Sequence, residues 1–96
     1  MKTLFQLLEK LDIPYEKIAQ CDSLPVNGIT LDSRTAGKHN IFTAIKGFQT
    51  DGHKFIDNAF AAECRNFLVE DAAKVPKEVC ENANVAEVKE IRRVFG

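Results

Sequence analysis

The chain lacks a surplus of charge of either sign and any long apolar run. Its 96 residues carry 13 Lys+Arg against 14 Asp+Glu, for a formal net charge of −1. A balance this close to zero argues against binding to nucleic acid or to an anionic membrane surface, because both are recognised through a positive field. No stretch approaches the roughly 18 apolar residues of a membrane span. We therefore expect a protein that uses neither nucleic acid nor a membrane as a partner.

Cysteine and histidine are also scarce. The three cysteines, Cys21, Cys64 and Cys80, are odd in number and widely spaced, which disfavours a disulfide framework and a closed zinc site. His39 and His53 lie near none of them in sequence. We expect three reduced thiols, a cytoplasmic location and no metal site. No Ser/His/Asp or Cys/His arrangement is visible, so we expect no catalytic residue in this chain.

The apolar content is sufficient for one small core. Hydrophobic residues make up 45% of the chain, and the length predicts a single domain over residues 1–96. A chain of this size buries only about 60–65% of the surface that its unfolded form exposes. An enzyme that consumes ATP usually needs more chain than this, so the length favours a binding module or a fragment of a larger protein.

Apolar spacing predicts an α/β domain. Leucines at positions 4, 7, 8 and 11 form one stripe of a helix over 3–11, and Thr3 and Gln6 have capping-box spacing. Strands are expected over 26–31, 41–45, 66–69 and, weakly, 77–81, and further helices over 52–63 and 84–95. Strands alternating with helices indicate a small three-layer-like fold with a short mixed, partly parallel sheet of about four to five strands and about three helices.

Several details of these elements are predicted as well. Residues 14–25 are expected to form a connector. Asp51 is a good N-cap for the second helix, and Asn84 for the third, with Glu87 three residues on. The buried stripe of the second helix would be Phe55, Ile56, Ala59 and Phe60, and that of the third Val88, Ile91 and Phe95.

The segment 41–55 has a strand–loop–helix layout that is common in phosphate binding, because free backbone N–H groups at a helix start attract anions. Gly47 and Gly52 have the spacing of a P-loop. That motif then requires Lys and Ser/Thr, whereas His53 and Lys54 follow here. An ATP loop is therefore disfavoured. A phosphate or nucleotide loop of another kind and a plain structural turn both stay open.

A second polar motif, Asp32-Ser33-Arg34, follows the strand expected over 26–31. Ligands of open α/β sheets bind off the carboxyl ends of the strands. If this strand and 41–45 are parallel neighbours, Ser33 opens on the same edge as the loop 47–52. Ser33, Gln49 and Thr50 offer neutral, directional groups that suit a diphosphate or a uracil ring. The alternative is turn chemistry with a surface ion pair.

These two motifs together resemble a known family. Gly-Ile-Thr-Leu-Asp-Ser-Arg at 28–34 and Ile-Phe-Thr-Ala-Ile-Lys-Gly-Phe-Gln-Thr-Asp-Gly-His-Lys-Phe-Ile at 41–56 are similar to the N-terminal domain of the Mur ligases. The branch that adds the third residue of the peptidoglycan stem, UDP-N-acetylmuramoyl-L-alanyl-D-glutamate ligase, is the most similar. The resemblance implies a domain that binds the UDP part of UDP-MurNAc-L-Ala-D-Glu. It also implies that the central ATP-binding and C-terminal domains of the same ligase, its further partners, are absent.

The resemblance also implies residue roles. Ser33 and Gln49 would hydrogen-bond the diphosphate and uracil, Leu31 and Phe48 would pack on the base or ribose, and Thr50 would complete the binding set. Loop-shaping roles fall to Asp32, Arg34, Gly47, Asp51 and Gly52. ATP and Mg²⁺ would be cofactors of the full-length enzyme only. The full-length enzyme would form an amide bond, and the isolated chain would be inactive.

Some residues depart from the family pattern. His39-Asn40 stands where the family has Gly-Asp, and Phe48 where many members have His. Glu63 replaces a glycine at the end of the second helix, where a left-handed cap costs a non-glycine residue on the order of 1 kcal/mol. These departures leave open the alternative that the chain is a stand-alone α/β interaction module. It would bind another domain through an exposed patch around Arg92, Arg93 and Phe95. The D-Ala-D-Ala-adding branch is a further alternative, although Ser33 and Gln49 favour the third-residue branch.

Overall fold

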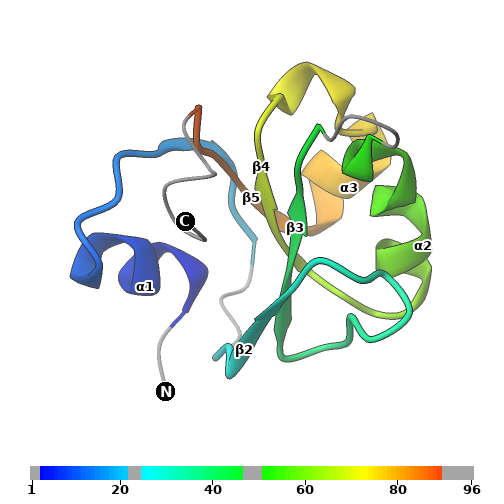
Figure 1. Ribbon diagram of the computed structural model, residues 1–96, viewed down its shortest axis with the longest axis horizontal. Helices are drawn as coiled ribbons and strands as arrows, with labels where there is room; N and C mark the ends of the chain where they lie inside the picture. Colours follow the sequence, from blue (N-terminus) through cyan, green and yellow to red (C-terminus); the bar gives the residue numbers. More distant parts are fainter. Residues whose placement is uncertain (1–2, 22–24, 47–50, 90–96) are drawn as a thin grey trace.

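A computed structural model describes residues 3–21, 25–46 and 51–89. Within these residues a five-stranded mixed sheet has the order β1-β5-β4-β3-β2, with helices on both faces (Figure 1). In chain order, the elements are α1 (Leu4–Lys10), β1 (Glu16–Ala19), β2 (Gly28–Thr30), β3 (Asn40–Ala44), the 3₁₀ turn η1 (Gly52–Phe55), α2 (Ile56–Ala61), β4 (Asn66–Val69), the 3₁₀ turn η2 (Ala72–Lys74), α3 (Lys77–Asn82) and β5 (Asn84–Glu87). The predicted α/β class with a partly parallel sheet is confirmed.

Four strands run parallel and one closes the sheet in the opposite direction. β2 pairs with β3, β3 with β4 and β4 with β5, all in parallel, whereas β1 pairs antiparallel with β5. All residues of β4 and β5 are buried, as expected of interior parallel strands that are covered on both faces. No helix in the described ranges is long and apolar enough to cross a membrane.

The core is divided between the two faces of the sheet. Strand residues facing α2 and α3 include Phe42, Phe67 and Val85, and the Phe42 and Phe67 rings meet edge to face at 6.2 Å. The alternate residues, among them Leu68 and Ala86, pack with α1. Figure 1 shows α1 on one side of the sheet and α2 with α3 on the other.

The first helix forms as its sequence predicts. The Thr3 hydroxyl accepts a hydrogen bond from the Gln6 N–H at 3.4 Å, and the Thr3 N–H donates to the Gln6 side chain at 3.1 Å. This reciprocal pair is the predicted capping box. Leu4 and Leu8 are buried, whereas Leu11, just past the helix end, is exposed.

The predicted third helix over 84–95 is wrong at its start, because Asn84–Glu87 is strand β5. Asn84 therefore caps no helix. Its side chain accepts from the Cys21 N–H at 2.9 Å and donates to the Asn66 side chain at 3.1 Å. Val88 is buried on the α1 side of the sheet, and the rest of the predicted apolar face, from residue 90 on, lies outside the described residues.

The weak strand predicted over 77–81 is also wrong, because Lys77–Asn82 is helix α3. Pro76 precedes the helix with φ −59°, a value that its ring fixes and that suits a helix start. The Pro76 carbonyl accepts from the N–H groups of Val79 and Cys80 at 3.0 and 3.2 Å.

The connector predicted over 14–25 contains strand β1. Its first two residues, Glu16 and Lys17, are both charged and exposed, so the sequence shows no alternation of apolar and polar residues there.

The two backbone departures have different outcomes. Glu63 adopts φ 75°, the left-handed conformation that the family pattern, with glycine at this position, led us to expect. His39 and Asn40 do not, since Asp12 and Glu63 are the non-glycine residues with positive φ in the described ranges. Asn40 instead begins β3, and its side chain accepts from the Gly37 N–H at 3.0 Å. The turn at residues 37–40 is therefore stabilised by the Asn40 side chain, and neither His39 nor Asn40 carries the steric cost of a left-handed backbone.

Candidate functional site

Two strand ends meet at one edge of the sheet. β2 and β3 are parallel neighbours, with Gly28 opposite Asn40 and Thr30 opposite Phe42. The residues after β2 and those after β3 therefore open on the same side, as the sequence predicted. A hollow of about 420 Å³ lies there. Its lining residues are Leu31, Asp32, Ser33, Arg34, Phe55 and Asn58.

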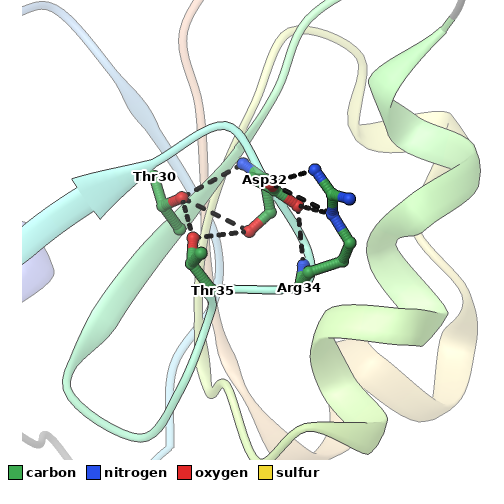
Figure 2. A network of polar contacts seen from close by, with 4 residues as sticks. All are labelled: Thr30, Asp32, Arg34 and Thr35. Atoms are coloured by element: carbon green, nitrogen blue, oxygen red, sulfur yellow. Dashed lines mark hydrogen bonds and ion pairs between the residues drawn. The ribbon is translucent and has the colours of Figure 1, made fainter.

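One wall of the hollow is a hydrogen-bonded turn that follows β2 (Figure 2). The Thr30 hydroxyl accepts from the Asp32 N–H at 3.1 Å and contacts the Thr35 hydroxyl at 2.7 Å. The Thr35 N–H and hydroxyl both donate to the Asp32 carbonyl, each at 3.1 Å. These bonds fix the backbone on both sides of Ser33, so its N–H and its Cβ are held at a defined place on the wall.

Asp32 and Arg34 form a paired charge within this turn. The guanidinium donates to both carboxylate oxygens, from Nε at 3.0 and 3.2 Å and from Nη2 at 2.9 Å. These bonds hold the pKa of Asp32 below its usual value. The Arg34 side chain is 88% exposed, so water screens the pair and it adds little stability. Because the two charges compensate, the wall presents directional groups rather than a net positive field.

The structure places two of the predicted binding residues at the hollow and adds two others. Leu31 is 57% exposed and Ser33 is half-buried. The opposite wall consists of Phe55 and Asn58. Sequence reasoning assigned Phe55 to the buried stripe of a helix, whereas it is half-buried at the end of η1. No sequence pattern distinguished Asn58 from any other exposed asparagine or glutamine on a helix.

The connection from β3 to η1 is anchored at both ends. Lys46 and Asp51 form an isolated antiparallel bridge, and the Gly52 N–H donates to the Ile45 carbonyl at 2.9 Å. A Cβ atom on Gly52 would lie 3.0 Å from the Ile45 nitrogen, so this close approach of backbones favours glycine. The predicted binding and loop residues Gly47, Phe48, Gln49 and Thr50 lie outside the described residues.

Asp51 was predicted to cap a helix over 52–63. It caps η1, the 3₁₀ turn with which this segment begins, whereas α2 starts after Phe55 without a side-chain cap. Its Oδ1 accepts from the His53 N–H at 3.0 Å and from the His53 ring at 2.6 Å, and its Oδ2 pairs with the Lys74 ammonium. The Lys74 and His53 hydrogen bonds hold the pKa of Asp51 well below its usual value. The other ring nitrogen of His53 accepts from the Asp71 N–H at 3.1 Å. No sequence pattern indicated this cluster beyond the cap itself.

Neither the cysteines nor the acidic residues assemble into a reactive centre within the described ranges. No group of three or more His, Cys, Asp or Glu side chains there could hold a metal ion. Cys64 and Cys80 are free thiols. Cys64 is fully buried, and this burial raises the pKa of its thiol, which makes it less reactive.

Comparison with known proteins decides the family. The family described as "Mur ligase family, catalytic domain" matches residues 25–94. The chain belongs to the Mur ligase family. Its curated relatives include the UDP-N-acetylmuramoyl-L-alanyl-D-glutamate–2,6-diaminopimelate ligase of Phocaeicola vulgatus, 34% identical over 91 residues, which covers 93% of this chain and 18% of the relative. The enzyme of the same name from Clostridium perfringens is 29% identical over 92 residues, with 96% and 18% covered.

Solved structures agree on the fold of this Mur ligase chain. MurF from Acinetobacter baumannii superimposes with a TM-score of 0.68 at 25% identity, over 97% of this chain and 19% of the MurF chain. The Mur ligase chain thus spans about a fifth of the length of the relatives it matches. Relatives by sequence and by structure therefore carry the names of two different ligases of the same family.

Proposed function

We propose that this Mur ligase domain binds the UDP part of UDP-MurNAc-L-Ala-D-Glu, within an ATP-dependent ligase that adds the third residue of the stem peptide. One observation carries the proposal. Ser33 lines a hollow off the carboxyl end of β2, directly beside the end of β3, where open α/β sheets bind their ligands. The curated relatives, whose names specify UDP-N-acetylmuramoyl-L-alanyl-D-glutamate as substrate, support the choice of ligand.

The proposed roles follow from the chemistry of the hollow. The Ser33 hydroxyl and N–H would donate to the diphosphate, and the exposed Leu31 would pack against the base or ribose. Phe48, Gln49 and Thr50 would bind from the neighbouring connection, with Gln49 hydrogen-bonding the uracil. Asp32 and Arg34 would shape the turn after β2. Gly47, Asp51 and Gly52 would shape the connection from β3 to η1. The compensated charge of Asp32 and Arg34 suits a ligand that is held by directional hydrogen bonds.

The remaining chemistry would reside elsewhere in the enzyme. In our proposal residues 1–96 are one substrate-binding domain, and the central and C-terminal domains of the same ligase bind ATP and Mg²⁺ and form the amide bond. The described residues do not fit either cofactor, because they include no metal-ligand cluster, and His53-Lys54 follows Gly52 where an ATP loop needs Lys and Ser/Thr. We therefore expect this chain alone to have no ligase activity.

A titration of the ¹⁵N-labelled chain with UDP tests the proposal. We expect amide shifts at Leu31, Ser33 and residues 48–50. Ser33→Ala should weaken binding about 2- to 10-fold, the range for one lost hydrogen bond. Thr35→Ser keeps a hydroxyl in the same turn and is the matched control. Shifts confined to other parts of the molecule, or none at millimolar UDP, would refute the proposed function.

Two alternatives have their own tests. The likeness to MurF keeps the D-Ala-D-Ala-adding branch as the second candidate, and an intact enzyme that accepts the UDP-MurNAc-tripeptide but not the dipeptide would establish it. A stand-alone interaction module would bind no UDP. Its predicted patch at Arg92, Arg93 and Phe95 lies outside the described residues, and a reading frame that continues past Gly96 into a Gly-x-x-Gly-Lys-Thr/Ser loop would argue against it.

A further inference from the structure

We propose that His53 is a positioning residue for the hollow. In its neutral form, with the hydrogen on Nδ1, it joins the start of η1 to the backbone before η2 and thereby fixes the wall that carries Phe55 and Asn58. The importance of this wall for UDP rests on the proposed function, whereas the tautomer and the link between the two turns stand on the geometry alone.

The tautomer of His53 follows from its two partners. The ring is buried, with 2% of the side chain exposed. The Asp71 backbone N–H lies 3.1 Å from Nε2. Because a backbone N–H can only donate, Nε2 must accept and cannot carry a hydrogen. The hydrogen is therefore on Nδ1, from which it is donated to Asp51 Oδ1 at 2.6 Å.

His53 belongs to a closed set of contacts between η1 and η2. Asp51 accepts from the His53 ring through one oxygen and from Lys74 of η2 through the other. The ring in turn accepts from Asp71, whose own side chain caps η2 by accepting from the Ala73 N–H at 3.0 Å. Two further carboxylates lie around this set: Glu70 accepts from the Lys46 N–H at 3.2 Å, and Glu87 accepts from the Ala72 N–H at 2.7 Å. Among the residues that the structure describes, the imidazole is the one buried side chain that bonds to both turns.

The two walls of the hollow are therefore held by different means. The wall at residues 31–34 has its own network around Thr30 and Asp32, which does not involve His53. The other wall begins two residues after His53, at Phe55 in the same four-residue turn, and continues to Asn58 in α2. Loss of the imidazole contacts should displace this second wall and leave the first in place.

Three variants separate the contacts of the ring. His53→Asn keeps a donor near the position of Nδ1, His53→Gln keeps an acceptor near that of Nε2, and His53→Phe keeps the ring but removes both. His39→Phe is the matched control, because His39 is exposed just before the amino end of β3 and its ring hydrogen-bonds to the Pro25 carbonyl, at 3.2 Å, rather than to η1 or η2.

The first measurement is the ¹⁵N spectrum of the wild-type ring. We expect a protonated Nδ1, an unprotonated Nε2 and slow exchange of the Asp71 N–H. A hydrogen on Nε2 would overturn the proposal, whatever the variants do. This result does not depend on UDP, so it tests the proposed tautomer even if His53→Phe fails to fold or if the wild type binds no UDP.

The second measurement is the UDP titration of each variant, well below its melting temperature. We expect His53→Phe to weaken UDP binding about 3- to 10-fold, the effect of about one ligand hydrogen bond lost when the wall is displaced, and to shift the Phe55 and Asn58 amides but not Ser33. The Asn and Gln variants should each recover part of the affinity, and His39→Phe should match the wild type. Wild-type affinity in His53→Phe would overturn the positioning role, whereas no binding by the wild type would instead refute the proposed function.

Discussion

Glu63 ends α2 in a backbone conformation that glycine adopts most readily. Its φ is 75°, and its N–H donates to the Phe60 carbonyl while the Cys64 N–H donates to that of Ala59, both at 3.0 Å. This pair of bonds is the Schellman arrangement. The side chain of Glu63 is exposed, and among the described residues it makes no contact that requires a glutamate. The steric cost of its left-handed backbone is therefore not offset by a side-chain interaction.

Replacing Glu63 with glycine should therefore stabilise the protein. We expect Glu63→Gly to raise the free energy of unfolding by about 0.5–1 kcal/mol, because the relief of left-handed strain outweighs the added entropy of the unfolded chain. Urea unfolding measures this change. Glu63→Ala is the control, since it removes the same side chain but keeps the Cβ. An equal gain from alanine would show that the strain is not the cause.

Asp12 occupies the equivalent position after α1, with φ 57°. Its N–H donates to the Glu9 carbonyl and the Ile13 N–H to that of Leu8, so α1 and α2 both end this way without glycine. Aspartate tolerates the left-handed region better than glutamate. The strain at position 12 is accordingly the smaller of the two.

At the scale of elements, the errors of sequence interpretation have one physical origin. In 84–87, Asn84 and Glu87 have capping-box spacing, but the segment is buried on both faces as an interior strand, and such short runs show no reliable period. The polar ends are satisfied by tertiary partners instead, Asn84 by Asn66 and Glu87 by the Ala72 N–H. These partners lie 15 or more residues away in sequence, beyond the reach of local patterns.

The site was partly predictable for the same reason. Ser33 and Leu31 follow a strand whose parallel pairing with 41–45 was a condition of the sequence argument; β2 and β3 do pair in parallel, and both residues lie at the hollow. Phe55 and Asn58 depend on how η1 and α2 lie against that strand end. The contacts that set this position, such as His53 with Asp71, join segments that no sequence motif links.

Glu87 provides a test of the link between β5 and η2. Its carboxylate accepts from the Ala72 N–H at 2.7 Å and pairs with Lys89 at 3.1 Å, and the Ala72 hydrogen bond is the main reason that its pKa lies below the usual value. A depressed pKa means that the stabilisation is present above the unfolded-state pKa, near 4.3, and is lost as pH falls below it.

We expect Glu87→Gln to lower the free energy of unfolding by about 1 kcal/mol at pH 7, because a neutral amide accepts a weaker hydrogen bond than a carboxylate. The difference from wild type should shrink below about pH 4, where the wild-type carboxyl also becomes neutral. Urea unfolding at several pH values measures it. Glu81→Gln, on an exposed residue, should show no such pH dependence, and a constant difference for Glu87→Gln would contradict the charge-based account.

At the scale of the whole molecule, the sheet joins two apolar layers that depend on each other. Ile41, Leu68 and Ala86 pack toward α1, while their strand neighbours pack toward α2 and α3. The side chain of each of these strand residues thus packs in one layer, whereas its backbone hydrogen bonds hold the sheet on which both layers pack. We infer that loss of the α1 layer lowers the stability of the entire sheet rather than releasing one helix.

Leu8→Ala tests this coupling, since Leu8 is 2% exposed within the α1 layer. We expect a loss of about 2–5 kcal/mol, a large share of the roughly 5–15 kcal/mol typical of a domain. Leu11→Ala, at a side chain that is 51% exposed, should cost far less. Hydrogen exchange should show faster opening of β3 and β4 in Leu8→Ala. Faster exchange confined to α1 would contradict the coupling.

The two outer strands, β1 and β2, have a consequence for behaviour at high concentration. β2 is three residues long, and β1 has four residues, of which Glu16 and Lys17 are exposed and charged and the pairing register shifts between Lys17 and Ala19. A sheet edge templates the addition of another chain only if it offers a long, flat and uncharged row of backbone groups. Neither edge does so, and the sheet is therefore protected at both sides from growing into a multi-chain assembly.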